Sequence, residues 1–462
     1  MTAETPAGLP GSIAGLRALI ERKALSPDEA LALQADAFRN EPWHCAVQAL
    51  PIAPGLQSAG PLSGVGLAHK DLFRLPNRIP ECGAAHPWPA APARAASAIV
   101  RLARAGSQPL AALAMAEHAC GATSENPRYP DLINPLDARA AVGGSSSGSG
   151  VAVAAGLCYG SLGTDTAGSV RIPAATCGVL GLKPTQGAVP ADGVAPLAPS
   201  LDNVGLLTRS AEDAVLLWRA LQSANFSHAR PSSVDAGMPA AHDDWKLATC
   251  WTHGDPGMSA TDRVTQEALD AFADECSARG RRRDVLLPDM PHWMRLAQTM
   301  LYAEAASTHA AALRAEQPAL GSLARTIALP GVALPASWYL QAREARTLHR
   351  RRFIAEILAD VHLLLVPALP AGLPDKDEVS TTSPAFRPRR LLDLFCWMSF
   401  VNYLGLPAAV FPVAYGQNAR PICVQAIARP GDEAVLLAFA RHAELRRFDG
   451  QGFTRLPAHQ PL

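Results

Sequence analysis

Short apolar runs alternate along the chain with stretches whose apolar residues recur at helical spacing. Residues 64–69 (GVGLAH) form an apolar run that ends at Lys70 and Asp71, which predicts a buried strand leaving the core at a charged pair. Residues 95–106 predict a helix that closes on a glycine, and a second buried element follows directly at Gln108. Strands and helices that alternate in this way favour an α/β fold.

The clearest predicted helix covers residues 26–38. Ser26 is the expected N-cap, Pro27 opens the first turn, and Glu29 completes a capping box with Ser26. Later apolar runs are bounded by polar or proline-containing segments and predict further strands. These runs are residues 246–251, 361–374 and 405–415.

Two other stretches are polar. Residues 224–245 are rich in proline and serine, which predicts a surface linker or a lobe boundary. Residues 336–358 have a helical composition rich in arginine, with acidic residues interspersed. This charge pattern is typical of a solvated helix face and does not favour a nucleic-acid surface.

Composition narrows the class of protein. The chain has 462 residues, of which 48% are hydrophobic and 18% charged, so it can bury a large core. Its 41 basic and 41 acidic residues give a formal net charge of zero, which argues against direct binding of nucleic acid or of an anionic membrane. We therefore expect a small-molecule partner.

Other composition signals concern location and metals. Nine cysteines are scattered singly without a CxxC pair, as in a cytoplasmic protein with reduced thiols. The sequence holds neither an apolar run of about 18 residues nor a signal-like N-terminus, so we expect no membrane segment and no export. The 13 histidines lack ligand spacing, and we expect no metal.

A glycine- and serine-rich tract, GGSSSGSG, covers residues 143–150. Such a tract is usually a flexible linker. Here it runs directly into VAVAAGL at residues 151–157, which must be buried, so a turn that brings backbone close to other groups explains it better. Nucleotide-binding loops do not fit, because no lysine follows the last glycine and Gly143 is adjacent to Gly144.

A second motif, GTDTAGSVRIPA, covers residues 163–174 and places Ser169 after a turn of small residues. Backbone amides in such a turn can converge on the oxyanion of a tetrahedral intermediate, which makes Ser169 a candidate nucleophile. A serine hydroxyl needs a base to take its proton. No GxSxG elbow surrounds Ser169 and no histidine stands out as that base.

Together with GLAHKDLF at residues 66–73, these motifs resemble the amidase signature enzymes, which are serine hydrolases with a Ser, cis-Ser, Lys triad. The resemblance extends over nearly the whole chain, including residues 134–149, 177–193, 200–214, 399–413 and 420–437. It implies Ser169 as nucleophile, Ser145 as the bridging serine after a cis peptide bond, and Lys70 as base.

The resemblance also implies a fold and an oxyanion hole. The fold is α/β, a single amidase domain over residues 1–462 with one large mixed β-sheet covered by helices on both faces, without a metal or an organic cofactor. Asp165 and Arg171 would support the oxyanion loop. Ala167 stands where the family usually has a second glycine, and His69 stands where an aliphatic residue is more usual. The oxyanion hole would consist of the backbone amides of Thr166, Ala167, Gly168 and Ser169.

The chemistry also depends on the surroundings of Lys70. A lysine with the usual pKa of about 10.4 is a poor base at neutral pH. Burial beside Leu67 and Phe73, with Val65 and Leu72 close by in the sequence, would favour the neutral amine. Neutral Lys70 would take a proton from Ser145, which takes one from Ser169. The alternative interpretation is a surface ion pair of Lys70 with its neighbour Asp71.

We therefore predict an amidohydrolase that cleaves the C–N bond of a small linear amide through an acyl-enzyme on Ser169. One alternative is the A subunit of a tRNA-dependent amidotransferase, which releases ammonia from glutamine and needs a partner subunit. The others are a hydrolase of urea-like substrates such as carboxybiuret and an inactive binding protein with the same fold. Residues 334–346 (LPASWYLQAREAR) show a faint similarity to the urea-related branch. Substrate-binding residues are not predicted, and a homodimer is left open.

Overall fold

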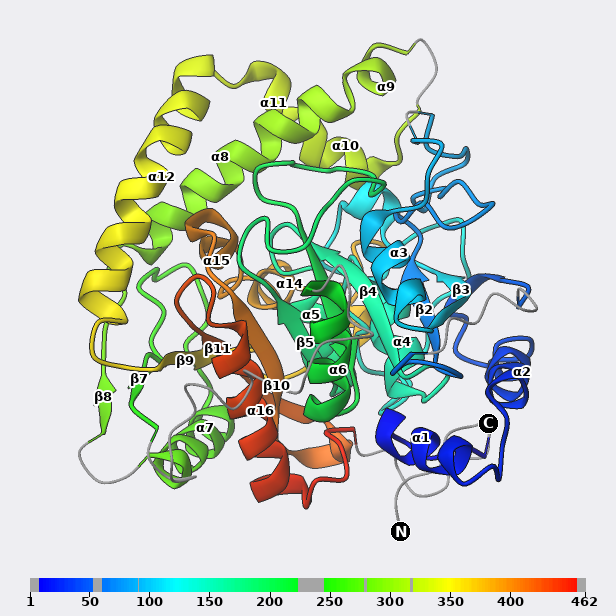
Figure 1. The fold of residues 1–462 in the computed structure, drawn as a ribbon. Helices are drawn as coiled ribbons and strands as arrows, with labels where there is room; N and C mark the ends of the chain where they lie inside the picture. The colour runs from blue at the N-terminus through cyan, green and yellow to red at the C-terminus, as the bar shows by residue number, and fades with distance from the viewer. Residues whose placement is uncertain are drawn as a thin grey trace.

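The computed structural model describes residues 8–52, 60–89, 91–222, 245–277, 281–315 and 319–454. Eleven strands in these ranges form one sheet (Figure 1). They are β1 (Ala46–Ala49), β2 (Gly66–Lys70), β3 (Gln108–Leu113), β4 (Gly160–Asp165), β5 (Leu180–Lys183), β6 (Asn203–Thr208), β7 (Leu247–Thr249), β8 (Arg282–Asp284), β9 (Leu363–Pro367), β10 (Ala408–Tyr415) and β11 (Pro421–Ile427).

The sheet is mixed and joins distant parts of the chain. Its strand order is β1-β3-β2-β4-β6-β5-β10-β11-β9-β7-β8. β2 pairs in parallel with β3 and β4, whereas β10 pairs antiparallel with β5 and β11. The predicted α/β fold with one large mixed sheet is therefore confirmed.

Helices cover the sheet and extend beyond it. They are α1 (Ile13–Glu21), α2 (Pro27–Ala37), α3 (Ser97–Arg104), α4 (Ser147–Ala154), α5 (Arg171–Cys177), α6 (Ala211–Gln222), α7 (Arg263–Cys276), α8 (Met290–Thr308), α9 (Ala310–Arg314), α10 (Ser322–Ala328), α11 (Pro330–Ala333), α12 (Ala336–Ile357), α13 (Lys376–Val379), α14 (Pro388–Asp393), α15 (Ser399–Leu404) and α16 (Glu433–Phe448), with 3-10 turns η1 (Glu117–Ala119) and η3 (Gln417–Ala419).

Both faces of the central strands are buried. Successive side chains of a strand point to opposite faces, and Leu206 of β6 packs in the cluster that includes α6 and α16. Its neighbour Leu207 packs in the cluster that includes α4 and α5. Likewise, Phe411 and Val410 of β10 belong to these two clusters. Burial on both faces explains why these strands are continuous apolar runs instead of alternating ones.

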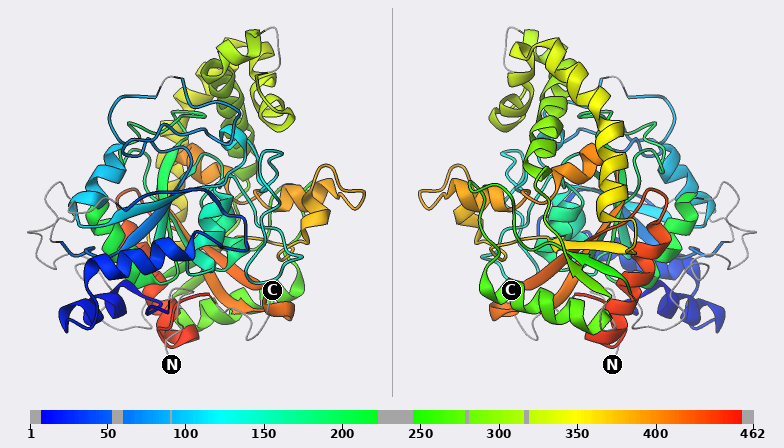
Figure 2. Two further views of the ribbon diagram at one scale, coloured as in Figure 1. Left: turned by 90° about the vertical axis from the view of Figure 1, so that its right-hand side faces the viewer. Right: turned by 90° about the vertical axis from the view of Figure 1, so that its left-hand side faces the viewer.

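A third cluster lies around β7 and β9 and joins α8, α12 and α15. Helices α8 to α12 project beyond the sheet at one end of the molecule (Figure 2). The arginine-rich α12 buries only Ala342 and Phe353, in agreement with the predicted solvated face. Arg346 is an exception, because its guanidinium donates to the backbone oxygens of Ser200 and Asn402 at 2.7 and 2.9 Å.

The local predictions can be compared with these elements. Ser26 caps α2 and forms the capping box with Glu29, as predicted. The predicted strands at 246–251, 361–374 and 405–415 are confirmed as β7, β9 and β10. The predicted linker at 224–245 lies outside the described residues except for Trp245, which is buried. None of the described helices combines the length and apolar character that crossing a bilayer requires.

Candidate active site

The glycine- and serine-rich tract is part of the core. Its second half forms the start of α4, which lies entirely within the core. A β-carbon on Gly144 would lie 2.1 Å from the backbone oxygen of Thr123, and one on Gly148 would lie 2.7 Å from the backbone nitrogen of Ala114. No side chain fits at such distances, so the tract is glycine-rich because backbone segments approach each other closely. The linker interpretation is wrong.

The tract places Ser145 against Lys70. The peptide bond between Gly144 and Ser145 is cis, and Ser145 is fully buried. Lys70, the last residue of β2, donates from Nζ to Ser145 Oγ at 2.7 Å and to Thr164 Oγ1 at 2.8 Å. The structure thus brings together two of the three predicted catalytic side chains.

Lys70 lies in an environment that favours its neutral form. Only 1% of its surface is exposed. Burial lowers the pKa of Lys70 to about 7, although the carboxylates of Asp202 and Asp165 act in the opposite direction. Its neighbour Asp71 pairs with Arg78 instead. The alternative of a surface pair between Lys70 and Asp71 is therefore wrong.

Ser169 lies in the loop between β4 and α5, next to the same tract. The backbone nitrogen of Ser146 donates to the backbone oxygen of Ser169 at 3.2 Å. Among the described residues, no hydrogen bond joins the hydroxyls of Ser145 and Ser169. Catalytic hydrogen bonds are often long before substrate binds, so this geometry is compatible with a relay that closes in the complex.

A buried ion pair holds the loop that carries Ser169. Arg171 Nε and Nη2 donate to the two carboxylate oxygens of Asp165 at 2.9 and 2.8 Å, and both side chains are fully buried. The carboxylate also accepts the backbone N–H groups of Gly168 and Val170 at 2.8 and 3.2 Å. Burial alone would raise the pKa of Asp165, but the Arg171 charge holds it below its usual value. The supporting positions predicted for Asp165 and Arg171 are confirmed.

Four polar residues of this site were not predicted. Thr164 accepts from Lys70, and Asp202 accepts from the Thr166 hydroxyl at 2.6 Å. Asn402 Nδ2 donates to the backbone oxygen of Asp165 at 2.9 Å, and Gln425 accepts from Arg171. Asn402 and Gln425 could have been found in the sequence, because each is a single amide side chain within an otherwise apolar run. A buried polar side chain needs a hydrogen-bond partner, so such a residue indicates a specific contact.

The predicted oxyanion amides differ in their hydrogen bonding. The Gly168 amide donates to Asp165, so it is already occupied. Within the described part of the chain, the amides of Thr166, Ala167 and Ser169 have no hydrogen-bond partner. The positive φ of the turn, +122°, falls on Gly168, and residues other than glycine rarely adopt this conformation. The methyl group of Ala167 instead lines a cavity.

His69 departs from the family pattern without adding charge. It is 2% exposed, and its Nδ1 accepts the backbone N–H of Leu162 on β4 at 3.2 Å. Burial lowers the pKa of His69 to about 3, so the ring stays neutral at neutral pH. Its contact supports the pairing of β2 with β4.

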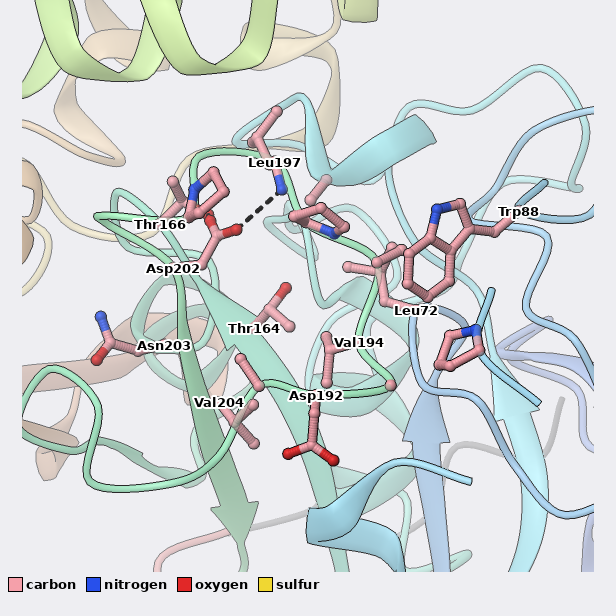
Figure 3. A pocket seen from close by; sticks show the side chains of 17 residues that line it. Leu72, Trp88, Thr164, Thr166, Asp192, Val194, Leu197, Asp202, Asn203 and Val204 are labelled. Atoms are coloured by element: carbon pink, nitrogen blue, oxygen red, sulfur yellow. Dashed lines mark hydrogen bonds between the residues drawn. The ribbon is translucent and has the colours of Figure 1, made fainter. Parts of the chain in front are cut away.

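Two cavities lie beside the loop. One, of about 120 Å³, is lined by Ser169 and by apolar side chains such as Ile172 and Phe395. The other, of about 350 Å³, is lined by Thr164, Trp88 and other residues (Figure 3). The described ranges hold no group of three His, Cys, Asp or Glu side chains arranged to bind a metal ion.

The chain resembles known proteins over most of its length. A family model described as Amidase matches residues 40–437. The chain belongs to the amidase family. This amidase-family chain is 33% identical over 397 residues to AtzE, a component of 1-carboxybiuret hydrolase from Pseudomonas sp. (strain ADP), with 82% of each protein covered.

Two further comparisons cover most of the chain. The GatA-type component of glutamyl-tRNA(Gln) amidotransferase from Cereibacter sphaeroides (strain ATCC 17029 / ATH 2.4.9) is 31% identical over 424 residues, with 84% of each protein covered. A crystal structure of an amidase superposes with a TM-score of 0.80 at 28% identity, covering 94% of this chain and 100% of the other. The family resemblance and the fold prediction are both confirmed.

Proposed function

We propose that this chain hydrolyses the C–N bond of a small neutral amide through an acyl-enzyme on Ser169. The observation that carries the proposal is Lys70, a buried lysine whose Nζ lies 2.7 Å from Ser145 Oγ. A lysine with a lowered pKa has a neutral fraction at neutral pH and can act as a base. Ser169 lines an apolar cavity, and its backbone oxygen accepts from the backbone nitrogen of Ser146, the residue after Ser145.

In the acylation step, Ser169 Oγ attacks the carbonyl carbon of the amide. Its proton moves to Ser145, whose own proton moves to the neutral amine of Lys70. The C–N bond breaks when the proton returns through Ser145 to the leaving nitrogen, which departs as ammonia or an amine. Water then attacks the ester with the same relay as base, which releases the carboxylic acid and restores Ser169.

The oxyanion formed in each step needs preorganised donors. We assign this role to the amides of Thr166, Ala167 and Ser169, which lack partners within the described residues. The Gly168 amide serves the loop instead, through its bond to Asp165. Removal of one such donor in other hydrolases slows catalysis by about 10²–10³-fold, so the exact form of this loop matters to the rate.

The smaller cavity disfavours the alternative substrates. None of the described side chains that line it carries a charge. A glutamine substrate would place an ammonium and a carboxylate near this site, and carboxybiuret would place a carboxylate there. Burial of a charge without a partner is strongly unfavourable. The cavity therefore supports a neutral acyl group, which also separates this chain from the 1-carboxybiuret named for one relative.

The cysteines bear on the compartment. All nine lie in the described residues, and each is buried as a free thiol. Proteins that fold in oxidising compartments commonly use paired cysteines as disulfides. We accordingly place the enzyme in the cytoplasm.

Hydrolysis in the presence of hydroxylamine tests the proposal. Hydroxylamine competes with water for an acyl-enzyme and converts the acyl group to a hydroxamate, which is measured beside the released amine. We expect both products with the wild-type enzyme and a loss of at least about 10³-fold with Ser169→Ala. Ser147→Ala is the matched control, because Ser147 is another buried serine, at the start of α4. Full hydrolysis by Ser169→Ala would overturn the proposal.

A further inference from the structure

The two cavities meet at the loop that carries Ser169. Ala119, Thr166 and Leu197 line both of them, so the cavities adjoin at this point. Any amide whose carbonyl lies between Ser169 and the loop amides would therefore have one substituent in each cavity. Their different sizes and linings determine which substituent goes where.

The smaller cavity suits the acyl substituent. It is the one that Ser169 lines, and its volume is about 120 Å³, against roughly 300–1,000 Å³ for pockets that bury drug-sized ligands. Ala122, Ile172, Leu301 and Phe395 contribute apolar surface. A short apolar acyl group would bury its surface here without leaving a polar group unpaired.

The larger cavity lies toward the base. It is lined by Thr164, which like Ser145 accepts a hydrogen bond from Lys70 Nζ, and by Leu72, two residues beyond Lys70. The leaving nitrogen must receive its proton from this relay, so the amine substituent belongs on this side. The cavity is about 350 Å³, and its rim at Asp192 and Pro199 is exposed to solvent.

The side chains that line the larger cavity indicate the chemistry of the amine. The Trp88 indole lies on one side, with Leu72 between it and Val194, while Thr166 and Asp202 lie on the opposite side (Figure 3). The Asp202 carboxylate already accepts from Thr166 and Leu197. The open surface is therefore largely apolar, with an aromatic ring that can pack against another ring.

We propose that the substrate is an N-substituted amide with a short apolar acyl group and a larger, ring-bearing amine. This inference rests on the proposed function of Ser169. Hydrolysis adds one water across the C–N bond and yields a short carboxylic acid and a primary amine. The acid forms in the smaller cavity, and the amine leaves through the exposed rim at Asp192.

Two isomeric amides test the orientation. N-benzylacetamide has a short acyl group and a ring on nitrogen, whereas N-methyl-2-phenylacetamide has the same atoms with the ring on the acyl side. We expect kcat/KM for N-benzylacetamide to exceed that of its isomer by at least about tenfold, the scale on which a misfit in an apolar pocket discriminates substrates. Equal values or the reverse order would overturn the inference.

Two substitutions locate the preference. Trp88→Ala should lower kcat/KM for N-benzylacetamide about 3- to 10-fold, as expected from the loss of an aromatic pair, and should lower it more than kcat/KM for acetamide, which carries no ring. Trp338→Ala is the control, since Trp338 is an exposed tryptophan of α12. Leu301→Ala enlarges the smaller cavity and should narrow the difference between the isomers. An unchanged ratio in both variants would contradict the assignment of the cavities.

Covalent labelling separates the function of Ser169 from the substrate preference. A fluorophosphonate that phosphonylates Ser169 reports an assembled nucleophile independently of any amide. If the wild-type enzyme is labelled and hydrolyses neither isomer, or prefers the wrong one, the inference about the substrate is overturned and the function of Ser169 stands. Absence of labelling would contradict the proposed function itself.

Discussion

At the scale of single residues, the burial of Lys70 has two opposing consequences. It lowers the pKa of the amine to about 7 and thereby supplies a base. It also disfavours the charged form in the folded protein, so the same residue reduces stability at low pH. Both consequences can be measured.

The first consequence is a pH dependence of the rate. Neutral Lys70 is the reactive form, so kcat/KM should decline about tenfold per pH unit below pH 7 and level off above it. A profile of kcat/KM from pH 5 to 9 with a neutral amide measures this decline. Ser26→Ala, at the distant capping box of α2, is a control that should show the same decline. A flat profile between pH 5 and 7 would argue against Lys70 as the base.

The second consequence is a pH-dependent stability. Between about pH 7 and the unfolded pKa near 10.4, the unfolded chain binds one more proton at Lys70 than the folded chain, so stability falls as the pH falls. Lys70→Met removes this proton. The free energy of unfolding of Lys70→Met, relative to that of the wild type, should therefore increase by about 1.4 kcal/mol for each unit by which the pH falls from 9 to 7.5.

Denaturant unfolding at several pH values measures this difference. Lys246→Met is the matched control, because it is the same substitution at an exposed lysine. If Lys70→Met and Lys246→Met changed alike with pH, the lowered pKa of Lys70 would be wrong.

At the scale of elements, the start of α4 packs directly on β3. A β-carbon on Gly148 would lie 2.7 Å from both the nitrogen and the oxygen of Ala114, and 2.8 Å from the oxygen of Cys45. These are backbone atoms that cannot rotate away. The glycines of the tract thus set the distance between α4 and the sheet, and through it the position of Ser145.

We therefore predict that Gly148→Ala destabilises the protein by about 1–3 kcal/mol, as overpacking does in other cores, and lowers activity as well. Thermal and denaturant unfolding measure the loss. Gly254→Ala is the control, since the nearest atom to a β-carbon there is 3.4 Å away. Equal stability of the two variants would show that α4 is free to move and that the packing argument fails.

The sequence predicted elements well where their signal was local. The capping box of α2 and the buried lysine at the end of β2 depend on neighbouring residues, and both are confirmed. Contacts between distant segments could not be predicted in this way. Asn402 bonds to Asp165 across 237 positions, and Arg346 reaches Ser200 across 146, so only the folded sheet reveals them.

At the scale of the whole molecule, the sheet interleaves early and late segments. In the sheet, β10 is the neighbour of β5, and β9 is the neighbour of β11. Strands after residue 360 therefore lie in the same sheet as β1, which begins before residue 50. This arrangement brings Asn402 and Gln425 to the loop of Ser169. Because the described parts of the chain share one sheet, we propose that they form a single domain.

A single domain of this kind should unfold cooperatively. We expect one calorimetric transition, with the same midpoint from fluorescence and circular dichroism. Ser26→Ala should shift this transition slightly as a whole, because its cap contributes about 1 kcal/mol. Two separate transitions would instead indicate two domains.

The central claim is that Ser169 is an assembled nucleophile. The most direct measurement is the intact-protein mass after treatment with a fluorophosphonate, for wild type, Ser169→Ala and the control Ser147→Ala. We predict one adduct on the wild type and on Ser147→Ala, formed with loss of fluoride, and none on Ser169→Ala. A wild-type protein without an adduct, or a Ser169→Ala variant that keeps it, would contradict the account.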